Sequence, residues 1–140
     1  MIEILLTDLN NENFYRETLK TIESICDEYS IGEHFGTLSM ANQMICDYLE
    51  SKSSVVANVA FRIDSDEVSF DYSLTNGDFS SFSQGDEADN TSMFVLRRLA
   101  DEVSFSTDYD TLTTTFHVKT KMTVHRNPQR VAVKSKIFSW

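Results

Sequence analysis

The 140-residue chain has little proline, glycine or cysteine: one Pro, four Gly and two Cys. So few prolines and glycines leave no room for a Pro/Gly-rich linker, and no internal repeat is visible. Cys26 and Cys46 form neither a CxxC motif nor a Cys/His ligand spacing, and a small secreted domain would normally need more disulfides. We therefore expect both thiols to be reduced and buried.

Long apolar runs are also missing, since the longest, such as Ile4–Leu6, span only a few residues. This excludes a bilayer-spanning helix and the apolar core of a signal peptide, so the expected location is the cytoplasm. The length suits a single domain with one sizeable core.

Positive charge is scarce over most of the chain. Through Phe116 there are 22 acidic side chains against six basic ones, a balance of −16, whereas from His117 onward there are six basic residues and no acid. An acidic body repels phosphates, so nucleic acid is not expected as a partner, except through the basic tail. We expect this tail to lie against its own acidic domain.

Apolar periodicity predicts the secondary structure. One helical stripe recurs at steps of three and four residues: Tyr15, Leu19, Ile22, Cys26 and Tyr29. Asn10 or Asn11 is its expected N-cap, and Gly32 its expected left-handed end. Further helices are predicted at Gly36–Glu50 and around Met93–Val103, a loop at Thr75–Thr91, and strands at Met1–Thr7, Ser54–Ile63, Val68–Leu74, Leu112–Val124 and Val131–Phe138.

Strands that follow one another through short connections favour an antiparallel sheet. The predicted fold class is therefore α+β: a two-layer sandwich, with a mostly antiparallel sheet, three helices packed on one face, and an extra C-terminal edge strand. Within the predicted loop, Phe79 and Phe82 are expected to fold back onto the core. For Phe138 and Trp140, at the end of the chain, two roles are open: packing on the core or contact with a partner.

Motifs for metal binding or nucleophilic catalysis are weak. His34, His117 and His125 lack zinc-ligand spacing, and no G-x-S-x-G elbow occurs. The acidic stretch from Asn76 to Asp89 lacks the alternating ligands and central glycine of a calcium loop. We therefore expect no metal site.

One segment, SMFVLRRLADEVSFSTDYDTLTTTFHVK at Ser92–Lys119, together with TNGDF at Thr75–Phe79, resembles the Bergerat-fold ATPases. This superfamily includes the histidine kinases (GHKL), and the chain looks most similar to its anti-sigma-factor serine kinases. The resemblance covers about Ile2–Lys119. It implies a histidine-kinase-like ATPase-type domain at 1–119, followed by a basic extension at 120–140 packed on the same domain.

The resemblance places TNGDF at the family's adenine box, where the family's Asp is Thr75 in this chain. A hydroxyl accepts a weaker hydrogen bond than a carboxylate. At the family's glycine-rich phosphate box the chain reads Asn90–Met93, and the nearest glycine is Gly85. Both changes weaken nucleotide binding.

The family's second helix carries a Glu that activates water and, four residues later, an Asn that holds Mg²⁺. Three registers stay open for that pair: Leu38 with Asn42, Asn42 with Cys46, and Met40 with Met44. None restores the Glu and the Asn together, so Mg²⁺-dependent phosphoryl transfer loses its positioning groups.

These changes predict a regulatory protein-binding module on a degenerate histidine-kinase-like fold, without ATP hydrolysis and with no bound cofactor. The vestigial nucleotide pocket implied by the resemblance comprises Asn42, Cys46, Thr75, Asn76, Gly77 and Phe79. The alternative is a divergent ATP-binding protein or anti-sigma-factor-type serine kinase that uses ATP and magnesium. The expected partner is a regulatory protein, a homodimer remains open, and no membrane contact is expected.

Overall fold

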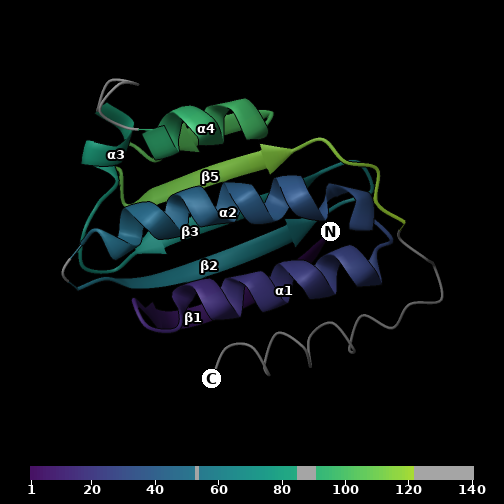
Figure 1. The fold of residues 1–140 in the computed structure, drawn as a ribbon, viewed down its shortest axis with the longest axis horizontal. Helices are drawn as coiled ribbons and strands as arrows, with labels where there is room; N and C mark the ends of the chain where they lie inside the picture. The colour runs from purple at the N-terminus through teal and green to yellow at the C-terminus, as the bar shows by residue number, and fades with distance from the viewer. Residues whose placement is uncertain (53, 85–90, 122–140) are drawn as a thin grey trace.

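A computed structural model describes residues 1–52, 54–84 and 91–121. In these residues a five-stranded sheet carries all the helices on one side (Figure 1). The elements follow in the order β1 (Ile2–Asn10), α1 (Phe14–Glu28), η1 (Gly32–His34), α2 (Phe35–Glu50), β2 (Val56–Ile63), β3 (Val68–Leu74), α3 (Ser80–Gln84), α4 (Thr91–Leu99), β4 (Glu102–Phe105) and β5 (Thr111–Phe116). The predicted α+β class with an antiparallel sheet is confirmed.

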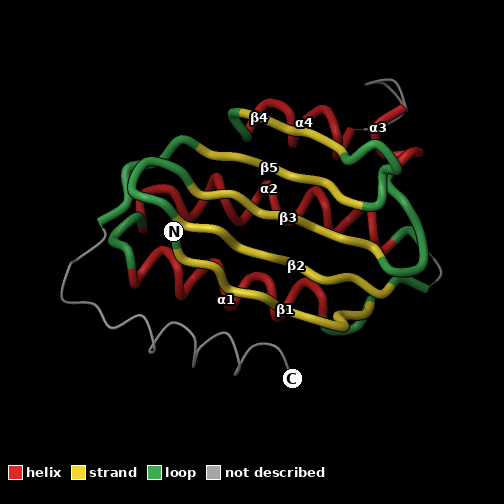
Figure 2. Tube along the Cα trace, turned by 180° about the vertical axis from the view of Figure 1, so that it is seen from behind, coloured by secondary structure: helices red, strands yellow, loops and turns green. Residues whose placement is uncertain are grey.

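The sheet order is β1-β2-β3-β5-β4, and every neighbouring pair is antiparallel. Seen from behind in Figure 2, the strands lie in front, and α1, α2 and α4 lie behind them. No described helix covers the near face in that view. The described chain is therefore two layers, with the core between helices and sheet.

The first strand is longer than predicted, because it runs to Asn10 rather than ending at Thr7. A register shift between Leu6 and Leu9 surrounds Asp8, whose φ of 56° is left-handed. This bulge returns Leu9 to the core face, so the strand continues past the polar residues that suggested a helix start. The prediction of Asn10 or Asn11 as N-cap was wrong: the N-cap of α1 is Asn13.

The end of α1 also differs from the prediction. No glycine in the described residues has a positive φ, whereas Ser30 has a φ of 57°. This left-handed residue turns the chain so that Ile31, which is fully buried, donates its N–H to the carbonyl of Cys26 at 2.9 Å. Gly32 instead begins the short 3₁₀ helix η1.

Strand β3 was predicted with its correct bounds, and β2 begins two residues after the predicted start. In β5 the expected core positions Leu112, Thr114 and Phe116 are buried, but Thr115, expected on the solvent face, is buried as well. The strand ends at Phe116 rather than Val124. Residues 117–121 then cross the end of the sheet, where Thr120 bonds Ser65 and Lys121 bonds Tyr29. The predicted edge strand Val131–Phe138 lies outside the described residues, as do His125, Phe138 and Trp140.

The predicted loop Thr75–Thr91 contains a short helix, α3, that the sequence analysis missed. The helix predicted around Met93–Val103 ends earlier, at Leu99, and Val103 belongs to β4. Helix α4 packs against α2 and buries Met93 and Leu96. Helices α2 and α4 are therefore in direct contact within the helix layer.

The core is continuous from helices to sheet, and both cysteines are buried in it as free thiols, as predicted. In the described part of the chain, no helix combines the length and the apolarity that crossing a membrane requires.

Candidate functional site

The TNGDF stretch begins directly after β3 and is held to the start of β2. Thr75 donates both its N–H and its hydroxyl to the carbonyl of Val56, at 2.9 and 3.1 Å. The side chain of Asn76 accepts the N–H of Val56 at 3.0 Å and donates to the carbonyl of Ser54 at 3.0 Å. Both side chains therefore continue the pairing of β2 with β3 beyond the last ladder residue.

Gly77 is exposed, and its φ is not positive. A Cβ added at this position would meet nothing within 4 Å. In this structure, therefore, nothing in the described chain requires glycine there. Asp78, the next residue, accepts hydrogen bonds from the N–H and hydroxyl of Ser80, at 3.1 and 2.7 Å. These bonds lower the pKa of Asp78, the hydroxyl of Ser80 contributing most.

Phe79 does not face solvent: it is fully buried, as is Phe82, so their predicted return to the core is confirmed. The ring of Tyr48, on α2, packs against both, with its centroid 5.9 Å from that of Phe79 and 4.5 Å from that of Phe82. Phe105 on β4 completes the group, 6.4 Å from Phe79. We call these four residues the aromatic cluster. It fills the space between α2, α3 and β4 next to TNGDF.

The hydroxyl of Tyr48 extends this packing with polar contacts. It lies 2.7 Å from the hydroxyl of Ser81 and donates to the carbonyl of Asp78 at 3.4 Å. The backbone N–H of Phe79 bonds the carbonyl of Tyr109 at 2.6 Å. The turn after β3 is therefore joined both to α2 and to the turn before β5.

Asn42 lies in the interior, between α1, α2 and β3, and is fully buried. Its amide nitrogen donates to the hydroxyl of Thr18 at 2.8 Å, and its oxygen accepts the hydroxyl of Tyr72 at 2.9 Å. Thr18 in turn donates to the carbonyl of Phe14 at 2.8 Å. To hold a metal ion the amide oxygen would have to leave the hydroxyl of Tyr72, and to hold a phosphate the amide nitrogen would have to leave the hydroxyl of Thr18.

Cys46 lies one turn further along α2 and is also buried. Burial raises its pKa, and a hydrogen bond with Thr18 offsets part of that rise. Burial likewise raises the pKa of Cys26 to about 11. Both groups are therefore neutral thiols at physiological pH, which makes them poor ligands and nucleophiles. No group of three or more His, Cys, Asp or Glu in the described ranges could hold a metal ion.

The predicted pocket residues thus occupy three places. Asn42 and Cys46 are in the core, Phe79 is in the aromatic cluster, and Thr75, Asn76 and Gly77 are exposed at the end of β3. The resemblance places the family's glycine-rich phosphate box at Asn90–Met93. Of these residues, Asn90 lies outside the described part of the chain, and Met93 is a core residue.

Sequence reasoning missed the partners that decide these positions. Neither Tyr72 nor Thr18 was singled out, and no contact between Tyr48 and the two phenylalanines was predicted. The spacing of Phe79 and Phe82, after the capping residue Asp78, is a signal that could have identified α3.

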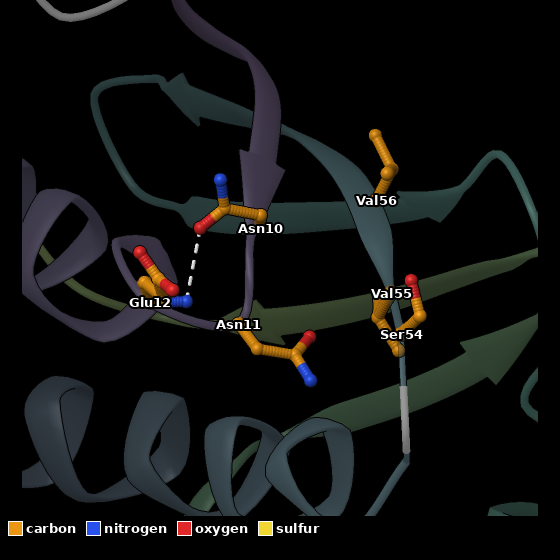
Figure 3. A pocket seen from close by; sticks show the side chains of 6 residues that line it. All are labelled: Asn10, Asn11, Glu12, Ser54, Val55 and Val56. Atoms are coloured by element: carbon orange, nitrogen blue, oxygen red, sulfur yellow. Dashed lines mark hydrogen bonds between the residues drawn. The ribbon is translucent and has the colours of Figure 1, made fainter.

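A small hollow lies beside the ends of β1 and β2 (Figure 3). Its walls include Asn10, Asn11 and Glu12 on one side and Ser54 on the other, and the oxygen of Asn10 accepts the N–H of Glu12 at 2.9 Å. Its volume is about 280 Å³, just under the roughly 300–1,000 Å³ of ordinary ligand sites. We assign no ligand to it.

A larger groove, of about 620 Å³, runs along β4 between the end of α3 and Arg97 of α4. Its walls are polar and aromatic, including Ser104, Phe105 and Tyr109. None of the predicted pocket residues lines it.

A scan against protein-family models matches no family, and a search of curated proteins finds no match.

Proposed function

We propose that this chain is a regulatory protein-binding module on a Bergerat-like scaffold, acting without ATP hydrolysis and in the cytoplasm. The element order supports the scaffold: a strand, two helices, a hairpin, a connection with a short helix, a further helix and a final hairpin, as the resemblance implies. The antiparallel sheet with its helices on one face supports the same proposal.

The observation that carries the absence of ATP chemistry is the aromatic cluster. The rings of Tyr48, Phe79 and Phe82 occupy the space next to TNGDF where the resemblance implies an adenine pocket. To admit a base, these rings would have to leave the core, and truncating one buried phenylalanine alone typically costs about 3–5 kcal/mol. A nucleotide would have to supply that energy before gaining any net affinity.

The phosphate end of such a pocket is equally unsuitable. Asn42, the only Asn in the candidate registers for Mg²⁺, has both polar atoms of its amide engaged in the core. Exposing it would leave the buried hydroxyl of Tyr72 without its acceptor, at a cost of about 1–3 kcal/mol. The scaffold therefore fits a function carried by its surface better than one carried by a pocket.

Thermal unfolding with and without excess ATP and Mg²⁺, together with a phosphate-release assay, tests the proposal. A ligand at 100 times its Kd stabilises a protein by about 2.7 kcal/mol, which would raise the midpoint by several degrees. We expect no shift and no phosphate release above the level without protein. A raised midpoint would favour a divergent ATP-binding protein, and phosphate release or partner phosphorylation that is absent from an Asn42→Ala variant with a native circular-dichroism spectrum would favour an active serine kinase.

A further inference from the structure

Strand β4 lies at one end of the sheet order and so has a neighbour on one side only within the described chain. In Figure 2 it is the outermost strand at its margin of the sheet, with α4 behind it. Its four residues pair with β5 from Glu102 opposite Thr115 to Phe105 opposite Leu112. The groove of about 620 Å³ follows this margin.

The register of β4 identifies which backbone groups point outward. Ser106 donates its N–H to the carbonyl of Thr111 at 2.9 Å, so this is a hydrogen-bonded pair. Hydrogen-bonded and non-bonded pairs alternate in an antiparallel ladder, so Ser104 also bonds β5, whereas Val103 and Phe105 face away from it. No other described backbone group bonds the N–H or C=O groups of Val103 and Phe105. An extended peptide could therefore pair with both residues.

One wall of the groove carries a positively charged side chain. Arg97, in the last turn of α4, is exposed and lines the groove, and no ion pair joins it to a carboxylate of the described residues. By contrast, Arg16 and Arg62 are paired with carboxylates. The carboxylate of Asp110, in the turn before β5, accepts a hydrogen bond from Ser106 at 2.8 Å within that turn. Arg97 is thus available to a partner.

We propose that β4 and Arg97 form a docking site for an extended segment of a partner protein, which adds as a strand to β4 and places an acidic side chain against Arg97. This mode of recognition takes affinity from backbone hydrogen bonds and specificity from alternate side chains. The groove volume falls within the range of ordinary ligand sites. The inference rests on the proposed protein-binding function and names its surface and the chemistry of its partner.

The probe for this site is a fluorescein-labelled strand peptide, Thr-Val-Asp-Val-Thr, measured by fluorescence anisotropy and by the amide shifts of ¹⁵N-labelled full-length protein. We expect saturable binding, with the largest shifts at Val103, Phe105 and their neighbours. N-methylation of the peptide amides that face β4 should abolish binding, because it removes the donors of the ladder. A peptide with Lys in place of Asp should bind more weakly.

Two neighbouring arginines provide a matched pair of protein variants. Arg97→Glu should weaken binding of the acidic peptide roughly fivefold to tenfold, as expected for reversing one exposed charge. Arg98→Glu makes the same change one residue later, on a side chain that stacks on Phe94 and does not line the groove, and should leave the affinity within about twofold. Both changes are on the surface, so both variants should fold.

The proposal is overturned if the peptide does not bind, if its shifts map elsewhere, or if the two arginine variants weaken it equally. Concentration-dependent broadening confined to Val103 and Phe105 without peptide would instead assign this edge to a second copy of the chain. None of these results would restore nucleotide chemistry, whereas a nucleotide-dependent thermal shift would overturn the proposed function and leave the peptide result standing.

Discussion

The pair Asn42 and Tyr72 offers the sharpest prediction about the interior. Asn42→Leu keeps the number and branching of the side-chain heavy atoms but removes two hydrogen bonds and leaves the fully buried hydroxyl of Tyr72 without a partner. The bond to Thr18 contributes about 1 kcal/mol net, and loss of the bond to Tyr72 orphans a buried hydroxyl at a cost of about 1–3 kcal/mol. We therefore expect a loss of about 2–4 kcal/mol, a large part of the roughly 5–15 kcal/mol that stabilises a typical domain.

Removing the hydroxyl of Tyr72 instead of the amide of Asn42 should cost less stability. Tyr72→Phe removes one bond and leaves only the oxygen of Asn42 unsatisfied, so we expect a loss of about 1–2 kcal/mol. The double variant removes both polar groups, while Thr18 keeps its bond to the carbonyl of Phe14. Its loss should therefore be smaller than the sum of the single losses, with a coupling energy of about 1–2 kcal/mol.

Urea unfolding of the four proteins, followed by circular dichroism, measures this cycle. Gln43→Leu is the control, because the amide of Gln43 bonds only the exposed Asp47, and it should change stability by no more than about 0.5 kcal/mol. A neutral Asn42→Leu, or strictly additive losses, would refute the argument, since Asn42 would then be free for another role.

The remaining predictions concern the turn after β3 and the thiols. Gly77→Ala should stabilise the protein by about 0.4–1 kcal/mol in thermal unfolding, because the site has open space and no positive φ, and a loss of stability would contradict this. The lowered pKa of Asp78 means that its contribution to stability is present above its unfolded pKa and is lost as the pH falls through the folded value. Ser80→Ala should raise that pKa towards its ordinary value in an NMR titration of the carboxyl group, and an unchanged pKa would be contrary to expectation. Cys26, with its pKa of about 11, and Cys46, raised by burial, should react with a thiol reagent at mildly alkaline pH only as fast as the protein unfolds, so an immediate reaction of the native protein would show that they are accessible.

Much of the fold was predictable because its apolar pattern is regular. Strand β3 and helix α2 alternate between core and solvent at the periods of their structures, so their bounds were correct or within one residue. The ends of elements were less predictable, because tertiary contacts decide them. Ser30 takes the left-handed conformation because Ile31 must turn into the core, although Gly32 is the better residue by local preference.

The candidate site shows the same limit more strongly. A sequence cannot say whether Asn42 faces a pocket or the core, since a polar residue on an apolar stripe fits both. Its partners, Thr18 and Tyr72, are 24 and 30 positions away, so only the packing of α1, α2 and β3 brings them together. Phe79 and Phe82 were expected in the core because exposing two such rings is costly, and that reasoning needed no partner.

The central claim is that the space next to TNGDF is filled by the protein itself, and a calorimetric titration of the full-length protein with ATP and Mg²⁺ tests it most directly. We predict no saturable heat at micromolar nucleotide. Micromolar binding that is lost in Thr75→Ala but kept in a matched surface change such as Thr37→Ala would contradict the claim, because it would require the rings of Tyr48, Phe79 and Phe82 to give way to a base.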